Sequence, residues 1–97
     1  MVTHIVMIKF KENTPNEKVL EIKKDIENLK DFIKEIQSME VGLNFANEDR
    51  AMDLVLISKF NSKDDLNSYA INSTHKEVIN KIKEVAEYTK VVDYENE

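Results

Sequence analysis

The stretch MDLVLISKF (residues 52–60) decides the fold, because it predicts a β-strand that is apolar on both faces. Side chains alternate between the faces of a strand, so Leu54 and Leu56 lie on one face. Val55 and Ile57 lie on the other. A strand buried on both sides needs a covering layer on each side. The rest of the chain predicts enough helix for one layer, so we expect the second layer to be the sheet of another copy.

The N-terminal segment, residues 2–11, predicts a second strand of the same kind. His4, one of only two histidines in the chain, shares the more apolar face of this strand with Val6 and Ile8. The opposite face carries two further apolar side chains, Ile5 and Met7. This strand therefore also favours a sheet that is covered on both sides.

A helix is predicted to begin directly after the first strand. Thr14 has the residue type of an N-cap, Pro15 suits the first helical position, and Glu17 completes a capping box. Apolar residues then recur every three or four positions, as Val19, Ile22, Ile26, Leu29, Ile33 and Ile36. This spacing gives the helix one apolar stripe, which we expect to pack on the sheet.

The remaining elements complete a βαββαβ order. Residues 39–45 alternate as a strand, and the polar residues 47–50 predict a short turn into the strand at 52–60. Ser62 predicts the N-cap of a short helix, and residues 72–74 supply the caps of a longer one. The last strand is predicted at residues 89–94.

This order predicts an α+β, ferredoxin-like fold with one antiparallel sheet and its helices on one face. A chain of 97 residues has the length of one domain, which we place at residues 1–97.

The composition excludes several classes of function. A net charge of −5, with 14 basic residues spread among 19 acidic ones, argues against sequence-independent binding of nucleic acid. No apolar run approaches the roughly 20 residues of a membrane helix, so we expect no membrane partner. The chain has no cysteine, which excludes disulfides and is compatible with a cytoplasmic location.

The charged segments predict no metal site. Two histidines and no cysteine leave no transition-metal signature, so we expect neither a metal nor a cofactor. We interpret the acidic residues 93–97 as a frayed end. The charged side chains of residues 21–24 and 81–84 are interpreted as solvent-facing helix surfaces.

Three polar residues are candidates for a site. His75 shares one face of the last helix with Ile79 and Ile82, so it should point into the same space as His4. Tyr69, on the short helix before it, should overlook that space. An imidazole can act as acid or base near neutral pH, and a tyrosine hydroxyl can hold an enolate oxygen. The alternative is structural: His75 caps its helix or binds backbone, and Tyr69 and His4 are core residues.

Four segments in this order resemble the stress-responsive dimeric α/β-barrel (Dabb) family. They are THIVMIKFK (residues 3–11), DLVLISKF (53–60), the run from Leu66 through Tyr69 to His75, and VVDY (91–94). The resemblance spans nearly the whole chain. It implies a ferredoxin-like protomer whose sheet packs on a partner's sheet to close a barrel, usually as a homodimer.

The resemblance also implies functions, since some members of the family are stress-induced and some plant members act as polyketide cyclases. The family often has His-Pro-x-His where this chain has Asn-Ser-Thr-His at residues 72–75, which argues against a mechanism based on a histidine pair there.

Two main hypotheses follow. The first is a homodimer that binds a small apolar or aromatic molecule in a cavity between sheet and helices, without catalysis. The second is a cofactor-independent cyclase, lyase or isomerase, with His75 as acid or base, Tyr69 as oxyanion partner and His4 as positioning group. A weaker third is a monooxygenase like those of other dimeric barrels. An open cavity lined by all three side chains favours the enzyme.

Overall fold

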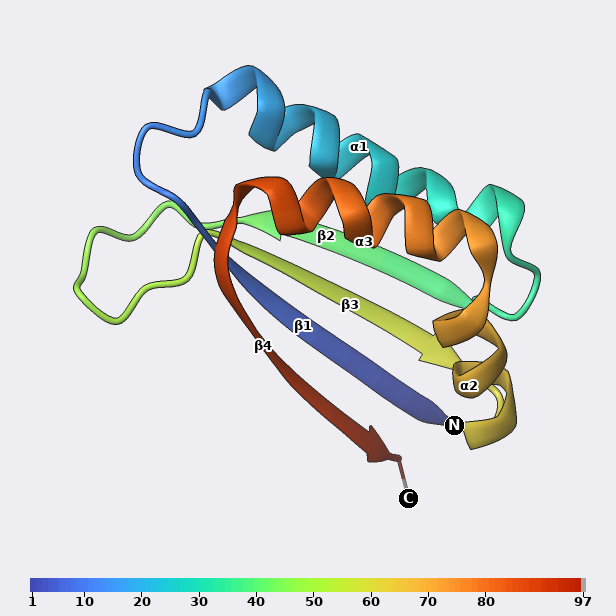
Figure 1. Cartoon of the computed structure of the whole chain (residues 1–97). Coiled ribbons are helices and arrows are strands. Elements are labelled where there is room, and N and C mark those ends of the chain that lie inside the picture. The colour runs from blue at the N-terminus through green and yellow to red at the C-terminus, as the bar shows by residue number, and fades with distance from the viewer. Residues whose placement is uncertain (97) are drawn as a thin grey trace.

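A computed structural model describes residues 1–96 and consists of one sheet with its helices on one side (Figure 1). The elements in chain order are β1 (Val2–Phe10), α1 (Asn16–Phe32), β2 (Ser38–Leu43), β3 (Leu54–Phe60), α2 (Lys63–Ile71), α3 (Ser73–Val85) and β4 (Ala86–Glu95). The four strands form one sheet in the order β2-β3-β1-β4, and every neighbouring pair is antiparallel. The predicted ferredoxin-like α+β class is confirmed.

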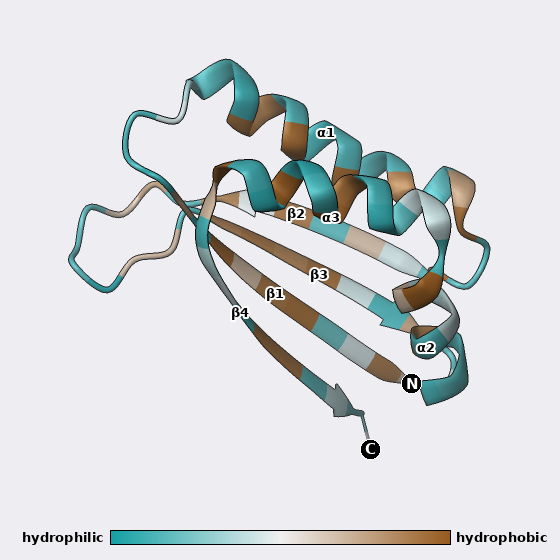
Figure 2. Cartoon of the chain, in the orientation of Figure 1, coloured by the Kyte–Doolittle hydropathy of each residue, from teal (hydrophilic) through white to brown (hydrophobic). Residues whose placement is uncertain are grey.

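The core lies between the sheet and the helices. The apolar stripe of α1 supplies Ile22, Ile26 and Leu29, and α3 adds Val78 and Ile82. The facing sheet surface carries buried side chains on its two central strands, namely Val2, Ile8, Phe10, Leu54, Leu56 and Phe60. Figure 2 shows hydrophobic residues along both central strands, β1 and β3. These strands therefore provide the floor of the core, as the sequence pattern predicts.

The other face of the sheet is also apolar. Strand pairing aligns Ile57, Ile5 and Val92 in one row across β3, β1 and β4, and Val55 stands opposite Met7 in the next row. These side chains are half-buried or exposed. All three helices of the described chain lie on the opposite side, so this face is open in the single protomer (Figure 1).

The predicted start of α1 is wrong in its details. Pro15 is the residue before the helix, and no side chain caps the helix. The hydroxyl of Thr14 instead donates to the Lys11 carbonyl, 2.6 Å away, in a tight turn that includes Asn13 at a φ of 66°. The Thr14 side chain therefore faces the preceding turn, and its oxygen accepts no amide proton from the helix.

The end of α1 also differs from the prediction. The helix ends at Phe32, so Ile33 and Ile36 are not part of it. Both are nevertheless buried, because the connection to β2 passes over the core.

The hairpin between β2 and β3 is longer than predicted. Strand β2 ends at Leu43, and the connection runs to Asp53. Phe45, predicted as the last strand residue, is 98% exposed in this connection. The alternation of apolar and polar residues over 39–45 therefore extends beyond the last residue of β2 that pairs with β3.

The caps of the later helices are confirmed. The Asp65 amide donates to the hydroxyl of Ser62, 3.1 Å away, and Asn72 accepts from the amides of Thr74 and His75. The last strand begins at Ala86, earlier than the predicted residue 89, because α3 ends at Val85 and the chain enters the sheet at once. Within residues 1–96, no helix is long and apolar enough to cross a membrane.

Candidate functional site

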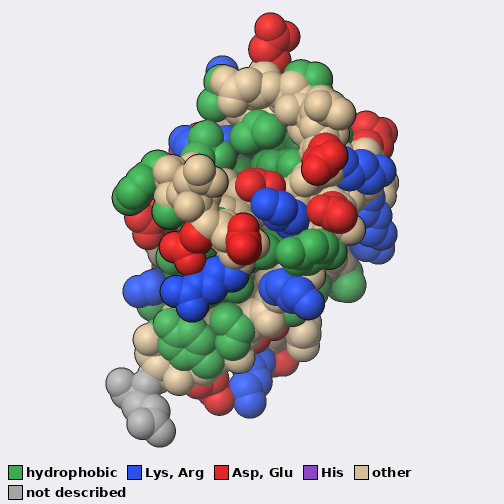
Figure 3. All heavy atoms as spheres, turned by 90° about the vertical axis from the view of Figure 1, so that its left-hand side faces the viewer, with side chains coloured by type: hydrophobic (Ala, Val, Ile, Leu, Met, Phe, Trp, Pro, Cys, Tyr) green, Lys and Arg blue, Asp and Glu red, His purple; other side chains and the backbone are tan. Residues whose placement is uncertain are grey.

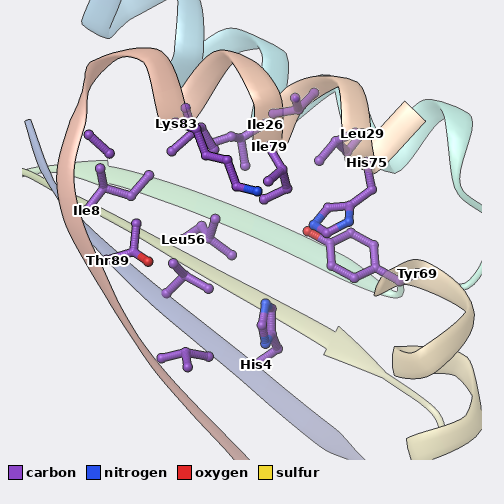
Figure 4. Close-up of a pocket in the computed structure, with 15 residues that line it drawn as sticks. His4, Ile8, Ile26, Leu29, Leu56, Tyr69, His75, Ile79, Lys83 and Thr89 are labelled. Atoms are coloured by element: carbon purple, nitrogen blue, oxygen red, sulfur yellow. The ribbon is translucent and has the colours of Figure 1, made fainter. Parts of the chain in front are cut away.

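A cavity of about 250 Å³ lies between the helices and the helix-facing side of the sheet (Figure 4). Most of its wall is apolar. The sheet contributes Val6, Ile8, Leu56 and Val91, α1 contributes Ile26 and Leu29, and α3 contributes Val78, Ile79 and Ile82. Val91 is 61% exposed, because it lies on the edge strand β4. The cavity is therefore an apolar chamber that is bounded on one side by an edge strand.

The three predicted site residues line this one cavity. The ring of Tyr69 lies between the two imidazoles, with its centroid 4.1 Å from that of His75 and 5.9 Å from that of His4. Figure 4 shows the three side chains reaching the cavity from α2, α3 and β1. The fold thus brings together residues that are distant in the sequence.

Tyr69 is held rigidly by its surroundings. Only 2% of its surface is exposed, and its ring packs on Phe60 with centroids 5.1 Å apart. Burial raises the pKa of Tyr69 above its usual value, because the phenolate would lose its hydration. The hydroxyl therefore stays protonated at neutral pH and can donate a hydrogen bond.

His75 has one ring nitrogen engaged with backbone. Its Nδ1 lies 3.3 Å from the Ala70 carbonyl, and because a carbonyl can only accept, this nitrogen carries the proton. Burial lowers the pKa of His75 below its usual value, the hydrogen bond to Ala70 opposes this shift, and nearby His4 adds to it. The imidazole is therefore neutral at pH 7 and keeps a lone pair on Nε2. The predicted structural role and a free basic nitrogen coexist in one side chain.

His4 is paired with a carboxylate that the sequence interpretation missed. Asp93 stands directly opposite His4 in the β1–β4 pairing, and its carboxylate contacts His4 Nδ1. Residues 93–95 belong to β4, and the Asn96 amide donates to the Met1 carbonyl. The predicted frayed end is therefore wrong for residues 93–96, while Glu97 lies outside the described residues. A carboxylate on Nδ1 fixes the orientation of the ring.

Lys83 is the second residue that sequence reasoning missed. Lys83 is exposed, as the interpretation of residues 81–84 has it, but it also lines the cavity, which that interpretation did not include. Residues 75, 79 and 83 are spaced by four, which places them on one helix face, so the periodicity contained the signal. A lysine beside an apolar stripe can lay its stem along the stripe and extend its amino group.

The described residues form no metal site. Within residues 1–96, no group of three or more His, Cys, Asp or Glu side chains is placed to hold a metal ion. The polar side chains that line the cavity are two imidazoles, a phenol, an amine and the hydroxyl of Thr89.

Comparison with known proteins identifies the family. A sequence model of the stress-responsive A/B barrel domain (Dabb) matches residues 2–96. The chain belongs to the Dabb family. The match covers the cavity and all the residues that line it. No curated protein matches the sequence.

Solved structures of similar fold include a dimeric ferredoxin-like protein of unknown function from Bacteroides fragilis. It is 34% identical, with a TM-score of 0.84 over 98% of this chain and 95% of that one. A protein from Arabidopsis thaliana is 23% identical, with a TM-score of 0.89 over 100% and 96% of the chains. A hydroxynitrile lyase from Passiflora edulis is 24% identical, with a TM-score of 0.86 over 96% and 90%. The two plant proteins show the same fold.

The environment of His75 predicts an abnormal titration. Because burial lowers its pKa, the NMR midpoint of its ring proton should lie below that of the same residue in the urea-unfolded chain. The unfolded state then binds the proton first as the pH falls. The contribution of His75 to stability is therefore complete above the pKa that it has in the unfolded chain. It is lost as the pH falls from that value toward the lower pKa of His75 in the folded chain. His75→Gln should remove this part of the pH dependence, and a normal midpoint in the folded protein would contradict the prediction.

Proposed function

We propose that this Dabb protein is a cytoplasmic homodimer whose cavity binds a small, largely apolar organic molecule, in line with the stress-related role named for its family. The observation that carries the proposal is the apolar cavity of about 250 Å³, which has few polar lining residues, three of them, His4, Tyr69 and His75, grouped together. This combination is typical of small-molecule sites, and the volume lies near their lower limit of roughly 300 Å³. The ligand is therefore small.

The homodimer is supported by the open face of the sheet. Its central row, Ile57, Ile5 and Val92, is apolar across three strands, and exposed apolar patches of this kind mark interaction surfaces. A second copy presents the same rows, so two sheets can pack face to face in the manner of a closed barrel. The related protein from Bacteroides fragilis is described as dimeric.

Light scattering should give a mass near twice 11.3 kDa at micromolar concentration. Ile57→Lys should dissociate or destabilise the dimer, because it buries an unpaired charge between the sheets. Leu20→Lys, on an exposed position of α1 away from this face, is the matched control and should leave the dimer intact. A folded wild-type monomer at this concentration would contradict the assembly.

Ligand binding can be tested with two neutral probes, 1-octanol and 1-naphthol, by titration calorimetry. We expect saturable binding of at least one of them to the wild-type dimer. Ala86→Phe should abolish this binding, because residue 86 lines the cavity and a phenyl ring would fill it. Ala46→Phe, in the exposed β2–β3 connection, makes the same change elsewhere and should have no effect. Absence of binding by both probes would overturn the proposal.

A cofactor-independent enzyme is the second candidate, and one specific observation favours it. The free Nε2 of His75 belongs to a neutral imidazole beside the protonated hydroxyl of Tyr69. In this arrangement His75 can take a proton from the carbon next to a bound carbonyl. Tyr69 can donate a hydrogen bond to the enolate oxygen that forms. His4, oriented by Asp93, can position the substrate. No observation favours the monooxygenase alternative over these two.

The enzyme candidate predicts proton exchange at a ketone. The wild-type protein should accelerate deuterium uptake from D2O at the α-carbons of 2-octanone, followed by NMR. His75→Gln and Tyr69→Phe should abolish the acceleration and change the melting temperature little, while Tyr88→Phe, on the exposed part of β4, should retain it. If His75→Ala lowers the free energy of unfolding by more than about 2 kcal/mol and leaves ligand binding unchanged, His75 has a purely structural role.

The charge distribution does not favour binding of nucleic acid. On the face shown in Figure 3, Lys and Arg side chains are interleaved with Asp and Glu. With a net charge of −5, this pattern does not favour phosphate binding.

A further inference from the structure

The cavity has a second polar region, which the acid-base candidate does not use. Lys83 lines the cavity from the last turns of α3, and Figure 4 shows its side chain extending from the helix into the chamber. The hydroxyl-bearing residue Thr89, near the start of β4, also lines it. His75 and Lys83 are eight residues apart on one helix, so their backbones are separated by about 12 Å along its axis. The two side chains therefore begin about two helical turns apart on the same face of α3.

The charge of Lys83 is uncompensated by the protein. Among residues 1–96, no hydrogen bond or ion pair of its amino group is present. Lys81, two residues earlier, points to α1 instead and pairs with Asp25 at 2.9 Å. A carboxylate of α1 therefore pairs with Lys81, whereas Lys83 at the cavity has no such partner among the described residues.

No other basic group of the cavity adds a net positive charge. His75 is neutral, because burial lowers its pKa. The carboxylate of Asp93 contacts His4, so the pair adds no net positive charge. Among the described lining residues, Lys83 is thus the one net positive group in an otherwise apolar wall.

We propose that the cavity selects an organic acid, whose apolar body lies along the chamber and whose carboxylate is held by the amino group of Lys83. This inference rests on the proposed ligand-binding function and names the class of its ligand. A carboxylate is costly to place against an apolar wall unless a cation meets it, and Lys83 supplies that cation at the exposed side of the chamber. The cavity volume of about 250 Å³ limits this acid to a medium-length chain or one aromatic ring.

The test compares octanoate with 1-octanol, two probes with the same chain length and different end groups. Calorimetric titration at neutral pH should show that Lys83→Met weakens octanoate binding roughly fivefold, the scale of a partly exposed ion pair. The same variant should bind 1-octanol as the wild type does, since methionine preserves the length and apolar stem of the side chain. Added salt should weaken octanoate binding to the wild type and not to the variant.

Lys76→Met is the matched control, because it removes the same charge from an exposed position of α3 that does not line the cavity. It should leave both affinities unchanged. Equal affinities of wild type and Lys83→Met for octanoate, or a parallel loss for both probes, would overturn the role of Lys83 while leaving the ligand-binding function intact. Failure of octanoate, 1-octanol and 1-naphthol alike to bind the wild type would overturn both the role of Lys83 and the ligand-binding function.

Discussion

The structure depends on the double burial required by its two central strands. Strands β1 and β3 carry apolar side chains on both faces, and water can be excluded from both faces only by two covering layers. The chain supplies one layer as helices, all on the same side of the sheet. The remaining face, with Ile5 and Ile57 at its centre, is the basis of the proposed dimer. The cavity lies on the other side of the sheet, between the sheet and the helices.

The cavity results from unequal coverage by the helices. Helix α1 packs on α3 and on β2, whereas β4 is an edge strand whose cavity-facing Val91 is largely exposed. Two helices cannot cover four strands evenly, so a chamber remains between α3 and the β1–β4 side of the sheet. The polar groups of the cavity come from the helices and strands at its border. The short helix α2 carries Tyr69, the start of α3 carries His75, and the β1–β4 pair carries His4 with Asp93.

The sequence predicts the fold well because the fold follows from local periodicity. Alternation identifies the strands, and the caps at Ser62 and Asn72 are correctly predicted, because a cap involves residues close in sequence. The two wrong predictions, Thr14 as an N-cap and Phe45 as a strand residue, both lie where the chain turns. The geometry of a turn is not visible in the periodicity of the sequence. Asp93 was missed because its partner lies at the other end of the chain, and only the strand register brings the two together. Lys83 was not predicted as a cavity residue, because the interpretation relied on its charge and not on its position on the helix face.

The separation of the polar groups constrains what the cavity can do. A base such as His75 needs to be neutral, and its burial beside Tyr69 keeps it so. An ammonium group at the same place would hold the carboxylate of an acid there, and the rest of that ligand would then extend away from the base. Lys83 instead lies two helical turns away, where an edge strand leaves the chamber exposed and the charge remains hydrated. One apolar chamber can therefore hold an acid by its carboxylate while leaving the opposite end of that ligand beside an uncharged base and a hydrogen-bond donor.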